Sequence, residues 1–107
     1  MLAVVAFTSL GSVAVAAPIQ GRPAAGKAIY DHSCALCHGR KGEGLGNQSA
    51  LPNFGDRQAM ARRTDQELFD KITNGGQGTG MPAWSKLLSE QERWDVLAYI
   101  RTLAASH

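Results

Sequence analysis

The sequence lacks the features that would assign it at once to several common classes. Its formal net charge is only +2 and its pI is near 8.7, so it has no strongly basic surface of the kind that nucleic-acid-binding domains carry. No apolar run reaches the roughly 20 residues that cross a bilayer as a helix. Aromatic residues make up only 7% of its 107 residues. A chain of this length holds one domain at most, and a small apolar core around a large flat ligand would suit it.

Cysteine is scarce as well, and the two that are present, Cys34 and Cys37, form one Cys-x-x-Cys pair. A thioredoxin-like dithiol would place such a pair near a βαβ unit, but the sequence shows no strand pattern. A structural zinc ion would need about four protein ligands, and the only further candidates are His32 and His107. Both interpretations stay open, and both lack support elsewhere in the chain.

A histidine follows the pair directly, in the run from Cys34 to His38. Cys-x-x-Cys-His is the attachment signature of a c-type haem. Two thiols three positions apart lie on one side of a helical turn, where they can add to the two vinyl groups of a haem, and the next imidazole can then bond the iron. We therefore predict one haem c, covalently attached through Cys34 and Cys37, with His38 as an iron ligand.

The N-terminal segment contains no charged side chain and has the character of a secretory signal. Ala14-Val15-Ala16 matches the A-x-A cleavage pattern, so a cut before Ala17 is expected. The basic n-region is missing, which leaves a truncated start open. An uncleaved membrane anchor is the alternative, although polar residues interrupt the run. The expected organisation is a signal peptide over 1–16, a linker over 17–23 and one domain over 24–107.

Helical signals frame this domain. A first helix is expected from Ala24 to Cys34, with Pro23 tolerated in its first turn. Gly26, Tyr30 and Cys34 fall on one of its faces at i, i+4 and i+8. The glycine on that face would let another helix approach closely, and the tyrosine would pack one turn before the first thioether.

Two capping boxes predict further helix starts. The run from Thr64 to Glu67 opens a helix to about Asn74, where Gly75 supplies the left-handed stop. The run over 89–92 opens a helix from Glu90 to about Ala104. Its apolar residues recur with helical spacing: Val96, Tyr99, Ile100 and Leu103.

Between these helices the sequence predicts a loop over 39–53, a short basic helix over 56–63 that bears Met60, and a second loop with four glycines between Gly75 and Gly80. The second loop is no phosphate cradle, because no Lys-Ser/Thr follows it and no strand precedes it. It leads directly into Met81 and Pro82.

These features together resemble the mono-haem class I cytochrome c family of the soluble bacterial type, from about Ala24 to Leu103. The shared points are a Gly and an aromatic residue before the haem motif, a Met-Pro after the glycine-rich loop, and the terminal helix. The resemblance implies an all-α fold of four to five short helices wrapped around one covalently bound haem, with the N- and C-terminal helices crossing. It also implies Met81 as the second iron ligand, opposite His38.

Other groups compete for that second position. Met60 could supply a sulfur ligand, but it lies in the expected helix over 56–63 and is flanked by charges. His107 would give an iron bound by two histidines. His32 is only two residues from Cys34 and cannot cross the ring. An open iron site is the remaining alternative, and the resemblance favours Met81 over all of these.

The hydrogen-bond acceptor for the second nitrogen of His38 is left open. The family often carries a proline near the position of Asn47, and the carbonyl that precedes it accepts this bond. The nearest proline here is Pro52. Some acceptor is expected, because it fixes the ring and tunes the iron.

An iron with both axial positions filled has no room for a substrate, so we expect an electron carrier and not an enzyme. The alternatives are a haem c subunit of a dehydrogenase or terminal oxidase complex, and a peroxidase or gas-sensing haem protein with a displaceable Met81.

The expected partners are redox proteins that dock transiently with electrostatic assistance, and we expect a monomer with no nucleic acid and no membrane span in the mature chain. The expected location is periplasmic, or attached to the periplasmic side of the membrane if the N-terminal segment is retained. Candidates for the docking cations are Lys27, Lys41, Lys71 and Lys86.

Overall fold

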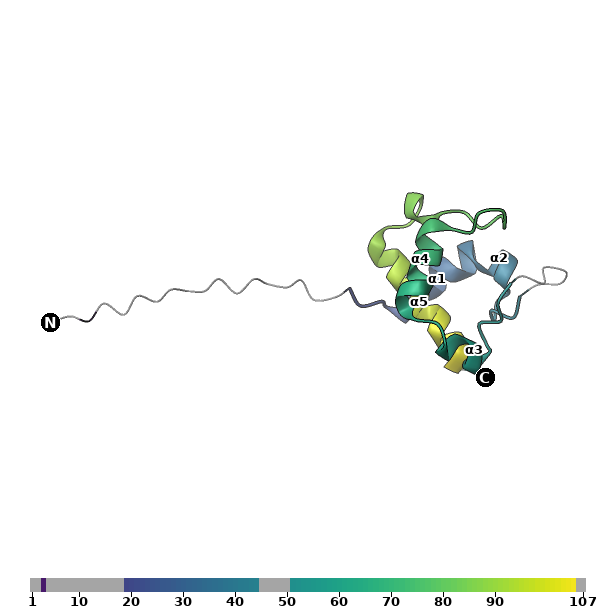
Figure 1. The fold of residues 1–107 in the computed structure, drawn as a ribbon, viewed down its shortest axis with the longest axis horizontal. Coiled ribbons are helices and arrows are strands. Elements are labelled where there is room, and N and C mark those ends of the chain that lie inside the picture. The colour runs from purple at the N-terminus through teal and green to yellow at the C-terminus, as the bar shows by residue number, and fades with distance from the viewer. Residues whose placement is uncertain (1–2, 4–18, 45–50, 106–107) are drawn as a thin grey trace.

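The computed structural model describes residues 3, 19–44 and 51–105. Within these ranges the chain forms five α-helices and one short 3-10 helix, and its β-type pairing is limited to an isolated bridge between Gly76 and Met81. The expected all-α architecture is therefore confirmed for this part of the chain. None of the helices described is long and apolar enough to cross a membrane. The elements are, in order, α1 (Pro23–Ser33), α2 (Ala35–His38), α3 (Arg57–Ala61), α4 (Asp65–Asn74), η1 (Trp84–Lys86) and α5 (Glu90–Ala105) (Figure 1).

Helix α1 lies within one residue of its predicted bounds. Pro23 stands at its start, where the missing N–H has no cost because the first amides of a helix have no intrahelical partner. The helix ends at Ser33, but the amide of Cys34 still donates to the carbonyl of Tyr30 at 2.8 Å. The chain then continues directly into the single turn of α2, so the Cys-x-x-Cys-His run is held at the end of α1.

Both capping boxes start helices as predicted. The hydroxyl of Thr64 accepts the amide of Glu67 at 3.1 Å at the start of α4, and this helix stops at Gly75, whose φ is +71°. At the start of α5, the hydroxyl of Ser89 accepts the amide of Glu92 at 3.1 Å, and the Glu92 carboxylate accepts the Ser89 amide at 2.9 Å. The local sequence alone therefore fixes where these two helices begin.

Helices α1 and α5 cross with their backbones in contact. A Cβ built on the buried Gly26 would overlap the carbonyl oxygen of Asp95 and would lie 2.9 Å from the Cα of Val96. One turn along α1, the ring of Tyr30 packs on that of Tyr99, with centroids 5.2 Å apart and planes inclined by 57°. The predicted crossing of the terminal helices is confirmed, and Gly26 and Tyr30 of α1 lie at the contact.

A buried carboxylate of α5 caps the N-terminus of α1. Asp95 is only 1% exposed, and it accepts the backbone amide of Arg22 at 2.8 Å and two guanidinium bonds from the same residue at 2.8 and 3.2 Å. Gln91 donates a further bond to it at 2.7 Å. The negative charge also faces the positive end of the α1 dipole. The crossing is therefore fixed by a fully hydrogen-bonded ion pair as well as by packing.

A second arginine joins α5 to the middle of the chain. Arg101 donates to the carboxylate of Asp65 at 2.8 Å, to the carbonyl of Met60 at 2.6 Å and to that of Arg63 at 2.5 Å. These acceptors stand at the end of α3 and the start of α4. Carbonyls at a helix end have no intrahelical partner, so the guanidinium supplies one and sets both helices against α5.

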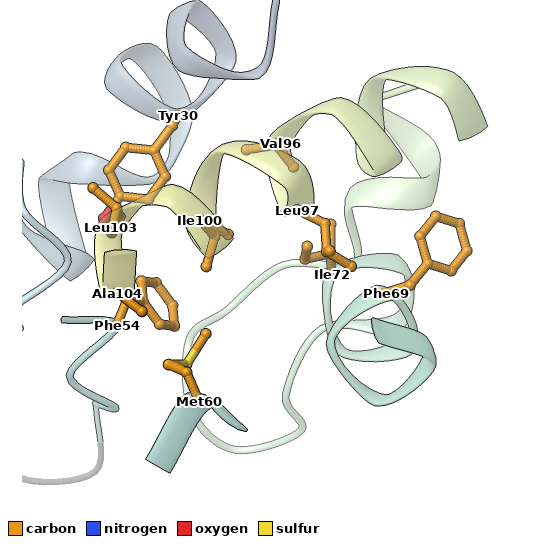
Figure 2. Packing of buried hydrophobic residues seen from close by; sticks show 10 residues of the cluster. All are labelled: Tyr30, Phe54, Met60, Phe69, Ile72, Val96, Leu97, Ile100, Leu103 and Ala104. Carbon is orange, nitrogen blue, oxygen red and sulfur yellow. The ribbon is translucent and has the colours of Figure 1, made fainter. Parts of the chain in front are cut away.

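The apolar core follows the length of α5. Figure 2 shows Leu97, midway along this helix, next to Ile72 of α4, with Phe69 of α4 farther out, and Tyr30 and Phe54 near the C-terminal end of α5. All five side chains are buried. The core therefore collects side chains from α1, α4 and the segment before α3 onto one helix. Its buried apolar members are Tyr30, Phe54, Met60, Phe69, Ile72, Val96, Leu97, Ile100, Leu103 and Ala104.

Replacing the glycine at the helix crossing tests this packing. Helix propensity alone would make Gly26→Ala stabilising by about 1 kcal/mol. The overlap with the Asp95 carbonyl acts in the opposite direction, so we expect a net loss of roughly 1–3 kcal/mol in the free energy of unfolding, measured with urea on the holoprotein. Ala25→Gly, at an exposed position of the same helix, is the control and should cost about 1 kcal/mol or less. A more stable Gly26→Ala protein would contradict the backbone contact.

The Asp95 ion pair predicts a pH dependence of stability. The hydrogen bond from Arg22 outweighs burial and holds the pKa of Asp95 below its usual value. Its contribution is therefore complete above the unfolded-state pKa of about 3.9 and is lost as pH falls through the lower folded-state pKa. Asp95→Asn should lower the free energy of unfolding by roughly 1–3 kcal/mol at neutral pH, and by less at the acid end of a urea-unfolding series. The exposed Asp31→Asn is the control, with an effect under about 0.5 kcal/mol. A loss that is equal at every pH would contradict the assignment.

Candidate haem-binding site

The haem motif forms one continuous helical turn. The amides of Cys37 and His38 both donate to the carbonyl of Cys34, at 3.3 and 3.0 Å. The two thiols are free; Cys34 is half-buried and packs against the apolar core, whereas Cys37 is exposed. The predicted arrangement, in which two thiols and an imidazole belong to a single turn, is present in the structure.

The thiol of Cys34 is not activated. Burial raises its pKa to about 11, and the neighbouring Cys37 acts in the same direction. Redox-active dithiols of the thioredoxin type depend on a lowered thiol pKa, since the thiolate is the reactive species. This environment therefore opposes the dithiol interpretation of the pair. Among the described residues, no group of three or more His, Cys, Asp or Glu side chains could hold a metal ion such as zinc.

The imidazole of His38 is held as a neutral ring. Burial lowers its pKa, which favours the uncharged form that bonds metals. Its ring stacks on that of Phe54, with centroids 4.8 Å apart and planes inclined by 24°. Its Nδ1 atom is buried and has no hydrogen-bond partner within the described residues. The described residues therefore provide no hydrogen-bond acceptor for this nitrogen of His38. Asn47, near which the family often carries its proline, lies outside the described residues.

Met81 closes a glycine-rich hairpin. The amide of Gly76 donates to the carbonyl of Met81 at 3.2 Å, and the hydroxyl of Thr79 donates to the carbonyl of Gly76 at 2.7 Å and accepts the Met81 amide at 3.4 Å. Gly78 and Gly80 have φ of +76° and +79°, conformations that side-chain-bearing residues rarely adopt. The half-buried Met81 side chain packs against the apolar core, as Cys34 does, so both predicted site segments meet the same core.

The competing ligands have other surroundings. Met60 is 3% exposed and lies within the core near the end of α5, so the charges that flank it in the sequence do not describe its environment (Figure 2). His32 is exposed on α1. His107 lies outside the described residues.

Sequence reasoning missed two residues that support the site. Phe54, which stacks on His38, follows a loop with no periodic pattern, so no sequence feature predicted its contact with the histidine. Arg93 donates to the carbonyl of Leu88 at 2.6 Å, and its guanidinium carbon lies 5.3 Å from the centroid of the Phe69 ring. It thereby ties the segment after Met81 to α5. The two ring contacts, Phe54 with His38 and Arg93 with Phe69, have no local sequence signal, because each joins residues that are distant in the chain.

The residues of this site fit a covalently attached haem. Two free thiols and a neutral imidazole share one turn, and the buried Nδ1 of that imidazole has no hydrogen-bond partner among residues 19–44 and 51–105. Phe54, from the segment before α3, stacks on this imidazole, and both the thiol of Cys34 and the thioether of Met81 pack against the same apolar core. Thiols, imidazole and thioether are the donor set of a c-type haem site.

Comparison with known proteins agrees with this chemistry. Residues 21–100 match the family model described as "Cytochrome C oxidase, cbb3-type, subunit III". Cytochrome c55X of Stutzerimonas stutzeri is 36% identical, over 85% of this chain and 76% of its own length. The chain belongs to the cytochrome c family. The resemblance to class I cytochromes c is thus confirmed, and the cofactor of the family is covalently bound haem c.

Further relatives differ in how much of them the chain covers. Cytochrome c-554(547) of Halothiobacillus neapolitanus is 34% identical, over 78% of this chain and 98% of its own length. The cbb3-type cytochrome c oxidase subunit CcoP of Azospirillum brasilense is 33% identical over 73% of this chain, which spans only 27% of that subunit. The solved structure of the c-type cytochrome KustC0563 superposes with a TM-score of 0.66 at 21% identity, covering 73% of this chain and 95% of the other. This last likeness confirms the fold.

Proposed function

We propose that this cytochrome carries single electrons, with one haem c attached through Cys34 and Cys37 and with His38 and Met81 on the two sides of its iron. The observation that carries the proposal is the neutral imidazole of His38, on the same turn as the two free thiols, with the Met81 hairpin closed against the same core. When bound, the haem supplies a one-electron iron couple.

The chain's own residues would then set how that couple behaves. Methionine is a weak donor, so Met81 favours the ferrous iron and raises the potential. The burial of His38 against Phe54 would act in the same direction, because a low-dielectric environment disfavours added positive charge. If His38 and Met81 both bind the iron, a substrate would have no access to it. This distinguishes a carrier from the peroxidase and gas-sensor alternatives.

The matches to CcoP favour one second candidate. The chain spans less than a third of the CcoP subunits that it matches, so its sequence also suits one haem domain of an oxidase assembly. The same four site residues would serve in that setting, but the protein would stay bound to its partners. Purification from the native host separates the two: a stable complex with other subunits favours the assembly, and a free small cytochrome favours the carrier.

Partner docking would be transient and assisted by charge. Leu36, inside the haem motif, is 84% exposed and is followed by the exposed cations Arg40 and Lys41. Lys27, by contrast, donates to Asp31 at 2.6 Å, so its charge is locally neutralised. An acidic redox protein that covers an apolar centre would suit the first group. We propose that the protein docks as a monomer in the periplasm; the signal peptide expected over 1–16 falls, apart from Ala3, outside the described residues.

Ligand identity is tested by the optical spectrum of the purified holoprotein. We expect the far-red ferric band of iron–methionine ligation, and its loss in Met81→Ala, because no other described sulfur would replace that ligand. Met60→Leu is the control and should keep the band, since this methionine belongs to the core. Replacing both Cys34 and Cys37 with serine should remove haem that survives denaturing electrophoresis. Rapid binding of carbon monoxide by the untreated ferrous protein would overturn the proposal.

Docking is tested by the salt dependence of electron transfer to an acidic redox protein. We expect the second-order rate to fall by roughly tenfold between low salt and about 0.5 M salt, because exposed charges are screened. Lys41→Gln should lower the low-salt rate more than Lys27→Gln, which removes the same charge from the middle of α1, where it is paired with Asp31. A rate that is independent of salt, or equal effects of the two variants, would count against the surface around Leu36.

A further inference from the structure

We propose that Tyr30 is a positioning residue for the axial imidazole: its hydroxyl fixes the turn after His38, and this turn holds Phe54 against the imidazole ring. The inference rests on the proposed function, because it concerns how the iron ligand His38 is oriented. An aromatic ring at this position could pack without a hydroxyl, so the hydroxyl of Tyr30 has a role of its own.

The first link is a buried hydrogen bond. Tyr30 is 0% exposed, and its hydroxyl donates to the carbonyl of Gly39 at 2.6 Å. Gly39 directly follows His38 and ends α2 with a φ of +85°. Burial raises the pKa of Tyr30 well above its ordinary value, so the hydroxyl keeps the proton that it donates. The bond therefore acts on the residue next to the predicted iron ligand.

The second link is the turn that starts at Gly39. Its carbonyl accepts the Gly42 amide at 3.0 Å in addition to the Tyr30 hydroxyl, so both of its lone pairs are used. The carbonyl of His38 accepts the amide of Gly44 at 2.8 Å. Both peptide groups after the imidazole are thus fixed by hydrogen bonds from outside α2. Without the tyrosine donor, the Gly39 carbonyl would keep a single partner.

The third link runs from the turn to the imidazole. The carbonyl of Gly42 accepts the amide of Phe54 at 2.8 Å, and a Cβ built on Gly42 would lie only 2.6 Å from the Cβ of Phe54. Phe54 therefore sits directly on this backbone, with its ring stacked on His38 at 4.8 Å. A shift of the turn must move Phe54, and with it the surface against which the imidazole rests.

The ring of Tyr30 has a separate function from its hydroxyl. The ring packs on Tyr99 across the helix crossing, a contact that phenylalanine would keep. Tyr30→Phe therefore removes the link to Gly39 and leaves the packing of α1 on α5 in place. Groups that hold a ligating histidine fix its ring orientation and tune the metal, so the effect should be visible at the iron.

The test uses the Tyr30→Phe holoprotein. We expect covalent haem and the far-red ferric band to be retained, while the hyperfine-shifted haem-methyl resonances of the ferric protein change position and order. In the ferrous protein, the amides of Gly42, Gly44 and Phe54 should exchange with solvent roughly five- to tenfold faster, whereas the amides of α5 exchange at wild-type rates. Local acceleration combined with a change at the haem is the expected signature.

Two further variants complete the test. Tyr99→Phe removes a hydroxyl from the other ring of the pair and should leave the methyl resonances and the turn amides unchanged. Phe54→Leu removes the last link, so it should shift the methyl resonances while Gly42 stays protected. If Tyr30→Phe does not accumulate as folded protein, Phe54→Leu alone decides whether the stacked ring orients the imidazole.

The results of these experiments distinguish a failure of the positioning role from a failure of the proposed function. Unchanged methyl resonances in Tyr30→Phe, or an equal acceleration of all amides including those of α5, would overturn the positioning role and leave the hydroxyl with a general effect on stability. A wild-type protein without covalent haem or without the far-red band would instead overturn the proposed function.

Discussion

The backbone contact between α1 and α5 is the constraint on which the rest of this structure depends. At Gly26 the two helices approach so closely that no side chain fits between them, and the carboxylate of Asp95 satisfies the first amide at the start of α1. Because the Cys-x-x-Cys-His run continues directly from α1, the position of that crossing also places the thiols and the imidazole. A change in the crossing would therefore move the two thiols and the imidazole together.

The rest of the site consists of segments that have little regular structure of their own. The turn after His38, the segment that carries Phe54 and the hairpin that ends at Met81 are held by a few hydrogen bonds and by glycines with positive φ. Such segments are stable only where a rigid element supports them. Helix α5 provides this support through Arg101, Arg93 and its apolar face.

The relatives of this chain include both small cytochromes and subunits of an oxidase. The family model covers residues 21–100, so the haem motif, the crossing of the helix pair and the methionine hairpin all lie within the span that this chain shares with its relatives. On the outer surface, Leu36 and the cations Arg40 and Lys41 lie exposed. The function of the site and the identity of the partner are physically separate properties of this chain.

The sequence by itself determined the haem motif, the helix starts at Thr64 and Ser89, and the glycine that permits the helix crossing, because each of these depends on residues close together in the chain. It could not predict the burial of Met60, the stack of Phe54 on His38 or the ion pair of Asp95 with Arg22. Those features join residues far apart in sequence, and a flanking charge or a loop composition carries no information about a distant neighbour. Only the tertiary structure decided them, because burial and contact are properties of the packed chain.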